Sequence, residues 1–151
     1  MSTAAIEDFR TSDLDALVRM WRDSFEYGVG ITTPHSLEDQ VTYFEREVLP
    51  NNRVRLAREA GRIVGFLASN TESVAQLHVR VGHHRRGIGT HLLDLAKANS
   101  AGTLWLFTFI RNTGACAFYE SQGFIVVQRG FEPTLQLEDV KYAWARPEDA
   151  V

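Results

Sequence analysis

The chain has 151 residues and a mass of 17.0 kDa, a length that fits one domain able to bury a core without disulfide staples. With 16 Lys and Arg against 19 Asp and Glu, the net charge is −3, which argues against a protein that coats nucleic acid. The single cysteine, Cys116, excludes an intramolecular disulfide and a cysteine-rich zinc site, and the absence of a membrane-length apolar run or a signal-like start predicts a cytoplasmic protein.

The first half of the chain is predicted to hold a strand, two amphipathic helices and a meander of three strands. From Leu14, apolar residues recur at i, i+3, i+4, i+7 and i+11, which indicates a helix that ends at 28–30. The second helix begins at Ser36, a residue type that caps free amides, and stops at Pro50. The predicted strands cover residues 4–10, 53–58, 63–69 and 73–80.

The second half alternates helices with strands. A helix is expected over 87–99, and the nearly continuous apolar run at 103–109 indicates a central strand covered on both faces. A second helix over 112–122 is followed by Gly123, which suits the left-handed residue after a helix end. Strands at 124–129 and 140–144 close the order β-α-α-β-β-β-α-β-α-β-β. This order predicts an α/β protein with a mixed sheet and helices on both faces.

A glycine pair stands where a strand runs into a helix. Gly87 and Gly89 place several backbone N–H groups at the positive end of the helix dipole, an arrangement that suits phosphate. Arg85 and Arg86 add charge beside it. The segment lacks the Gly-Lys pair of a P-loop, and Leu92 replaces the third glycine of a dinucleotide fingerprint. Taken alone, the pattern also fits an ordinary tight turn.

A second group of residues shares one face of the helix expected at 112–122. Asn112 and Tyr119 are seven residues apart, about two helical turns, with the small Ala115 between them. A polar cap, a small residue and a phenol on one face can form a groove wall with a proton donor at one end. The same residues also fit an ordinary helix with Asn112 as its N-cap and Tyr119 half-buried.

Together, in this order and spacing, the two segments resemble motifs A and B of the GCN5-related N-acetyltransferase (GNAT) superfamily. The turn at 84–89 is similar to Q/R-x-x-G-x-G/A, and residues 112–124 fit N-x-x-A-x-x-x-Y-x-x-x-G-F. The resemblance covers essentially the whole chain. It implies the GNAT fold, an α/β mixed sheet of six to seven strands with splayed central parallel strands and helices on both faces.

The resemblance implies acetyl-CoA as a cosubstrate, with no metal, held between the strands at 73–80 and 103–109. Tyr119 would protonate the leaving thiolate, since a phenol with a pKa of about 10 can donate to a thiolate of about 8.5. A backbone N–H, such as that of Val79, would stabilise the oxyanion. The expected acetyl-CoA-binding residues are Leu77, His78 and Val79 through their backbone, His84, Arg85, Arg86, Gly87, Ile88, Gly89 and Thr90 at the pyrophosphate, and Asn112 and Tyr119 along the pantetheine.

The sequence departs from the family pattern in three places. His84 stands at the Q/R position, and Val81 replaces the usual proline. The glutamate that serves many relatives as a base falls at or near Ser73, so Glu72, His78 or water remain as alternatives. In relatives the region at 25–27 lines the acceptor pocket, where an acid between two aromatic rings suits an ammonium group; it also fits a plain helix end.

The predicted function is acetyl-CoA-dependent transfer to a primary amine, by direct attack in a ternary complex. Cys116 is expected in the core, on the side of its helix opposite the groove, which argues against an acetyl-cysteine intermediate. The acceptor is a small molecule or peptide, with no nucleic-acid or membrane partner, and relatives of this size often form homodimers. The alternatives are a non-catalytic acyl-CoA-binding or regulatory module of the same fold and a nucleotide-binding oxidoreductase.

Overall fold

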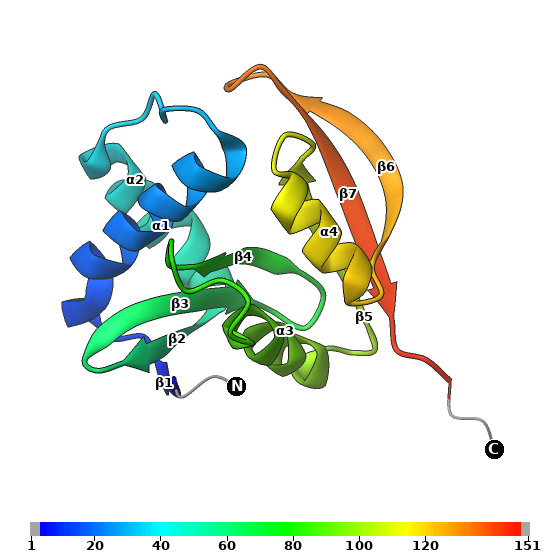
Figure 1. Ribbon diagram of the computed structural model, residues 1–151, viewed down its shortest axis with the longest axis horizontal. Helices are drawn as coiled ribbons and strands as arrows, with labels where there is room; N and C mark the ends of the chain where they lie inside the picture. Colours follow the sequence, from blue (N-terminus) through cyan, green and yellow to red (C-terminus); the bar gives the residue numbers. More distant parts are fainter. Residues whose placement is uncertain (1–3, 149–151) are drawn as a thin grey trace.

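Seven strands form two antiparallel sheets in the computed structural model, which describes residues 4–148 (Figure 1). In the first sheet the order is β1-β2-β3-β4, and in the second it is β5-β7-β6. A parallel bridge between Ser73 and Trp105 joins the two sheets. The strands are β1 (Ala5–Asp8), β2 (Arg53–Glu59), β3 (Arg62–Ser69), β4 (Val74–Val79), β5 (Thr103–Phe109), β6 (Ile125–Glu132) and β7 (Leu137–Ala145).

The helices cover both faces of the strands, as predicted. Helices α1 (Leu14–Val29) and α2 (Leu37–Tyr43) pack on one face of the first sheet. Helices α3 (Ile88–Asn99) and α4 (Thr113–Ser121) share a second core with the opposite face and with the second sheet. Figure 1 shows α4 between α1 and the strands of the second sheet. The fold class expected from the sequence is therefore confirmed.

The two helices before β2 begin and end where their sequence signals stand. Gly30 closes α1 in the left-handed conformation, with φ of 77°. The Ser36 hydroxyl accepts a hydrogen bond from Asp39 N at 3.0 Å and so caps α2. A π-helical turn (Phe44–Val48) and a 3₁₀ turn (Leu49–Asn51) continue α2, and a further 3₁₀ turn (Thr11–Asp13) precedes α1. Among the described residues, none of the helices is long and apolar enough to cross a membrane.

The C-terminal hairpin is longer than predicted. The sequence favours strands at 124–129 and 140–144, whereas β6 runs to Glu132 and β7 starts at Leu137. Gly130, Pro133 and the acidic residues near them weaken the strand pattern there. Cross-strand pairing holds the segment extended nonetheless, because β6 pairs along its length with the central strand β7.

Candidate active site

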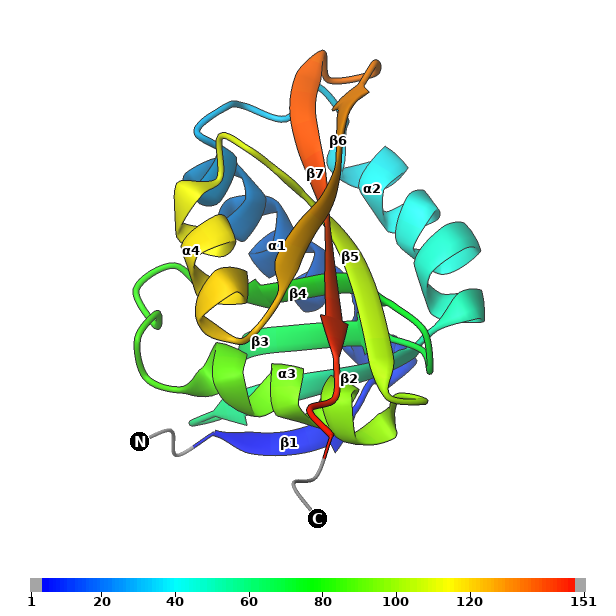
Figure 2. The ribbon, with the colours of Figure 1, turned by 90° about the vertical axis from the view of Figure 1, so that its right-hand side faces the viewer.

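Strands β4 and β5 separate beyond the bridge that joins them. Trp105 N donates to Glu72 O at 3.1 Å, next to the Ser73–Trp105 bridge. Further along, β4 pairs with β3 and β5 pairs with β7, and no bridge between β4 and β5 follows within residues 4–148. Figure 2 shows the two strands running apart from this point. The open end of this V lies at the C-terminal ends of both strands.

The backbone of β4 can be divided by the direction in which its polar groups point. Arg80 N donates to Val64 O at 2.8 Å, and the register pairs His78 with Phe66. Because backbone groups alternate along an antiparallel pair, Arg80 and His78 direct theirs toward β3. Leu77 and Val79 therefore direct theirs toward β5, and within residues 4–148 no strand pairs with them on that side. The expectation that the His78 backbone faces the opening is wrong, because β3 occupies it.

The turn between β4 and α3 concentrates backbone amides at a helix start. Gly87 is the N-cap of α3, with φ of 82°, and Arg85 also has positive φ, 64°. A Cβ added at Gly87 would meet nothing within 4 Å, so this amide-rich turn faces open space. Arg85 is exposed and has no ion-pair partner among the described residues, whereas Arg86 lies 3.5 Å from Glu59. The turn therefore has the geometry of an anion site.

Other residues of the turn serve packing. The Ile88 side chain is 2% exposed and belongs to the core, so only its amide can reach a ligand. A Cβ on Gly89 would lie 3.4 Å from Phe118 of α4 and 3.6 Å from Val79, which lets α3 approach both elements. The Thr90 hydroxyl accepts a hydrogen bond from Gln122 Nε2 at 3.5 Å.

Asn112 begins α4. Its Oδ1 accepts a hydrogen bond from Ala115 N at 3.1 Å, so it acts as the N-cap. Its amide also fills the space beside Gly28 of α1, where a Cβ would lie 2.6 Å from Asn112 Nδ2. The close approach of α1 and α4 thus depends on a glycine whose packing role the sequence does not reveal.

Tyr119 lies deep in the core formed by α3, α4 and the second sheet. Tyr119 is 7% exposed, and its ring packs edge-on to the ring of Phe124 at a centroid distance of 5.7 Å. Among the described residues its hydroxyl has no hydrogen-bond partner. Burial, together with the nearby Cys116 thiol, raises the pKa of Tyr119 above its ordinary value, so the phenol stays protonated at neutral pH.

His78 sits in a small polar network on the α1 side of β4. Its Nε2 lies 2.9 Å from Gln76 Oε1, and its Nδ1 lies 3.1 Å from Ser24 Oγ. Because an amide oxygen can only accept, Nε2 carries the hydrogen and Nδ1 accepts from the Ser24 hydroxyl. The ring also stacks on Phe66 at 5.5 Å. Desolvation in this packing lowers the pKa of His78 to about 3, which makes it a neutral and weak base.

Acidifying the solution from pH 7 to pH 5 should destabilise the wild type more than a His78→Gln variant. Below pH 6.5 the His78 side chain binds a proton in the unfolded chain, whereas in the folded chain it stays neutral down to about pH 3. The free energy of unfolding therefore decreases as the pH falls. One proton corresponds to about 1.4 kcal/mol per pH unit, and we expect an extra loss of about 1–2 kcal/mol in the wild type. Urea unfolding at both pH values measures it. His91→Gln, at an exposed site on α3, is the control, and equal losses in wild type and His78→Gln would contradict the prediction.

Glu72, the other side chain expected as a base, lies at the closed end of the V. Its carbonyl accepts from Trp105 N beside the bridge, whereas the strands separate toward Val79 and Phe109. An exposed carboxylate at the closed end is poorly placed to serve an acceptor at the open end. Of the three alternatives that the sequence left, geometry and proton affinity favour water.

The last turns of α1 reach both sides of the opening. Phe25 packs edge-on to Phe109 at the end of β5, at 6.1 Å, and Tyr27 stacks on His84 of the turn, at 5.9 Å. The Glu26 carboxylate accepts a backbone N–H from the loop after α1 at 2.7 Å. These residues are helical, and Tyr27 is 67% exposed, so they are not simply core aromatics. That they line an acceptor pocket stays a prediction.

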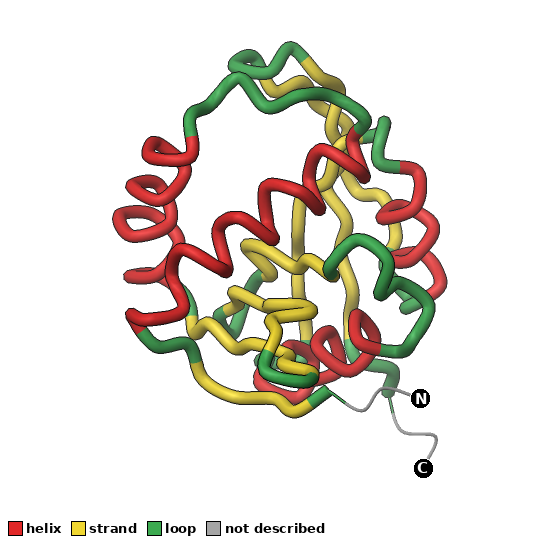
Figure 3. The backbone as a smooth tube through the Cα atoms, turned by 60° about the vertical axis from the view of Figure 1, so that its left-hand side comes forward, coloured by secondary structure: helices red, strands yellow, loops and turns green. Residues whose placement is uncertain are grey.

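Arg111 is a structural residue that sequence reasoning missed. Its Nε donates to Val29 O at 3.1 Å and its guanidinium reaches Gly30 O at 3.4 Å, which satisfies carbonyls at the end of α1. The loop between α1 and α2 also lies beside the turn between β6 and β7 (Figures 1 and 3). Both contacts join segments far apart in the sequence, so no local pattern could signal them. Among residues 4–148, no three His, Cys, Asp or Glu side chains gather as a metal site requires.

Comparisons with known proteins agree with this geometry. The family model described as "Acetyltransferase (GNAT) family" matches residues 14–124, which include the glycine turn and α4. Peptidyl-lysine N-acetyltransferase YiaC of Escherichia coli (strain K12) is 25% identical over 140 residues, covering 92% of this chain and 95% of YiaC.

Two solved structures show a similar arrangement of elements. PaiA N-acetyltransferase of Thermoplasma acidophilum, solved in complex with coenzyme A, has a TM-score of 0.76 at 16% identity, covering 95% of this chain and 99% of that one. YncA of Salmonella typhimurium, solved with acetyl-CoA, has a TM-score of 0.72 at 15% identity, covering 99% and 98%. At such identities the likeness establishes a shared fold.

Proposed function

This chain belongs to the acetyltransferase (GNAT) family, and we propose that it is an acetyl-CoA-dependent N-acetyltransferase acting on a primary amine by direct attack in a ternary complex. The observation that carries the proposal is the separation of β4 and β5 beside the turn at Gly87. Unpaired strand backbone and helix-start amides lie next to each other there. The names of the relatives, which include acetyltransferases solved with coenzyme A and with acetyl-CoA, support the same function.

The residues around the opening fit acetyl-CoA. The backbone groups of Leu77 and Val79 that point away from β3 would bind an extended amide-bearing arm in the manner of an added strand. The amides of residues 85–90 and the free guanidinium of Arg85 would hold the pyrophosphate. Asn112 would act by holding the start of α4 in place. Bound acetyl-CoA supplies an acetyl thioester, whose acyl transfer to an amine releases the CoA thiol.

Tyr119 would act as the acid. A phenol with an ordinary pKa of about 10 is protonated at neutral pH, so Oη can donate its proton to a thiolate. Burial raises the pKa of Tyr119 further, which keeps the phenol in this donor form but makes it a weaker acid. The Val79 N–H, which points away from β3 and has no strand partner in the part of the chain that the structure describes, would donate to the developing oxyanion. The amine would lose its proton to water, since His78 is a weak base and Glu72 lies at the closed end.

The expected result of a functional assay is binding of acetyl-CoA together with release of CoA thiol in the presence of an amine. The amine panel should contain lysine peptides, because a relative is a peptidyl-lysine N-acetyltransferase, as well as peptide N-termini, polyamines, aminoglycosides and amino acids. Calorimetry would measure acetyl-CoA binding, and a thiol reagent would measure turnover. Binding without turnover on any amine would favour the acyl-CoA-binding module. Thermal stabilisation by NAD(P) and not by acetyl-CoA would overturn the proposal.

A further inference from the structure

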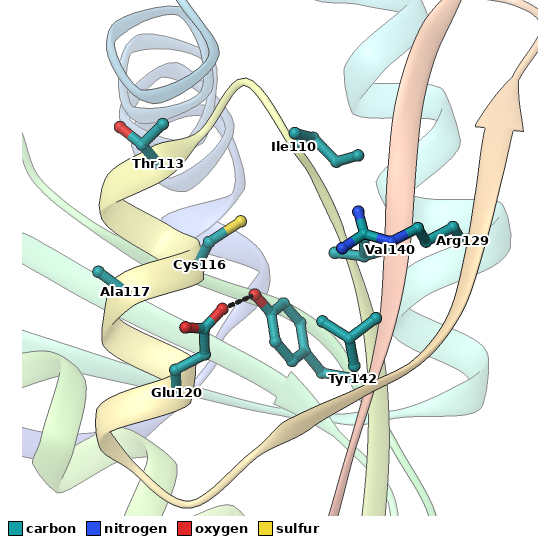
Figure 4. A pocket seen from close by; sticks show the side chains of 9 residues that line it. Ile110, Thr113, Cys116, Ala117, Glu120, Arg129, Val140 and Tyr142 are labelled. Atoms are coloured by element: carbon teal, nitrogen blue, oxygen red, sulfur yellow. Dashed lines mark hydrogen bonds between the residues drawn. The ribbon is translucent and has the colours of Figure 1, made fainter.

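A hydrogen bond ties α4 to the middle strand of the second sheet. Tyr142 Oη of β7 donates to Glu120 Oε2 at 2.6 Å (Figure 4). Tyr142 is 1% exposed and sits on β7, which pairs with a strand on each side, while Glu120 lies near the C-terminal end of a helix of nine residues. The fixed partner is therefore the tyrosine, and the helix is the element that the bond holds.

Tyr142 also touches the proposed acid. Its ring lies 6.0 Å from the ring of Tyr119, the residue before Glu120. Neighbouring side chains on a helix point about 100° apart, so Tyr119 enters the core while Glu120 reaches the β7 hydroxyl. Because the Tyr119 hydroxyl has no hydrogen-bond partner among the described residues, the position of the phenol depends on ring packing and on the rotation of α4.

An open pocket lies beside α4. It has a volume of about 320 Å³ between α4 and the β6–β7 hairpin, and Cys116, Glu120, Arg129 and Tyr142 line it (Figure 4). Cys116, expected in the core, is half-buried: it packs against the core cluster and also lines this pocket. A helix face that packs against protein is held by close packing. The part of α4 that lines the open pocket has fewer such contacts, so the Tyr142–Glu120 bond adds restraint on this side of the helix.

We infer that Glu120 and Tyr142 are positioning residues: their hydrogen bond fixes the rotation of α4 and thereby holds the Tyr119 phenol where it donates its proton. The inference rests on the proposed role of Tyr119. Burial and the bond to Glu120 raise the pKa of Tyr142, so its hydroxyl remains a donor at neutral pH. Neither residue needs to touch acetyl-CoA or the amine.

Three single variants separate the bond from the rest of each side chain. Tyr142→Phe removes only the donor, Glu120→Leu removes the acceptor, and Glu120→Gln keeps an oxygen that can accept. We expect kcat to fall about 10-fold in the first two, with the KM for acetyl-CoA unchanged, because a misplaced reacting group slows the reaction without weakening binding. Glu120→Gln should stay close to the wild type.

The decisive comparison repeats Tyr142→Phe in a Tyr119→Phe background. If the bond acts by positioning the phenol, the second substitution causes no further loss of kcat once the phenol is gone. A purely structural role would lower kcat by the same factor in both backgrounds, and that result would overturn the inference.

Hydrogen exchange gives a second readout that needs no turnover. Amides of 113–121 should exchange faster in Tyr142→Phe and Glu120→Leu than in the wild type or Glu120→Gln. Unchanged exchange in Tyr142→Phe would overturn the inference whatever the activity. A different result would separate the two proposals: faster exchange in Tyr142→Phe, together with wild-type turnover in the single variant Tyr119→Phe. It would support the restraint on α4 and overturn the proposed role of Tyr119.

Discussion

Replacing Tyr119 with phenylalanine should lower kcat by about 100-fold or more while the affinity for acetyl-CoA stays within about twofold. The substitution removes one oxygen and its proton and keeps the ring that packs on Phe124 and Tyr142. The thiolate then leaves without a proton from the enzyme, whereas binding through the backbone of β4 and the turn is untouched. Steady-state kinetics and calorimetry with acetyl-CoA measure the two quantities separately.

We expect Tyr119→Phe to leave the thermal stability of the protein intact. Removing a hydroxyl that has no hydrogen-bond partner among the described residues costs no bond within the protein, so Tm should stay close to that of the wild type. Tyr43→Phe is a matched control, since Tyr43 is 51% exposed on α2, and its kcat should equal that of the wild type. If Tyr119→Phe retained full turnover, Tyr119 would have no part in the mechanism. A drop in kcat accompanied by a large fall in Tm would point to misfolding.

The sequence predicts this fold well where the signal is local. Apolar spacing from Leu14 and caps at Gly30 and Ser36 depend on residues a few positions apart, and the structure confirms those helices. The continuous apolar run at 103–109 predicts β5 with its observed bounds. The expectation that β5 is covered on both faces is wrong, because Trp105 and Phe107 on one face are 39% and 54% exposed. The strands predicted for the C-terminal hairpin are shorter than the observed ones. The reason is that β6 is an exposed edge strand, where alternation between buried and exposed residues is weak.

The candidate site likewise contains some features that local sequence predicts and others that only the folded chain reveals. The turn around Gly87 and the cap at Asn112 can be found in sequence, because their chemistry requires particular residue types at fixed spacing. The direction of the His78 backbone depends on the β3–β4 register, which no motif encodes. The bond between Glu120 and Tyr142 joins residues 22 positions apart, so only the folded chain brings them together.

Substituting valine for Gly87 should weaken acetyl-CoA binding by about 10- to 100-fold, a loss of about 1.4–2.7 kcal/mol. Gly87 holds φ at 82°, a conformation that a β-branched residue resists, and it caps the start of α3. The new side chain would extend into the open space where the proposed pyrophosphate meets the amides. Both effects turn or block the helix-start N–H groups that would bind the anion. Calorimetry with acetyl-CoA, and with CoA alone, measures the loss.

Gly82→Val is the control that isolates the ligand effect from backbone strain. Gly82 has φ of 90° and, like Gly87, has nothing within 4 Å of an added Cβ, so the two substitutions impose comparable strain on the same loop. Gly82 lies five residues before Gly87, the N-cap of α3, and outside the amides of 85–90. We therefore expect similar decreases in Tm for both variants and a loss of acetyl-CoA affinity in Gly87→Val alone. Equal affinity in the two variants would mean that the pyrophosphate binds elsewhere, because a substitution at the proposed anion site would then affect binding no more than one outside it.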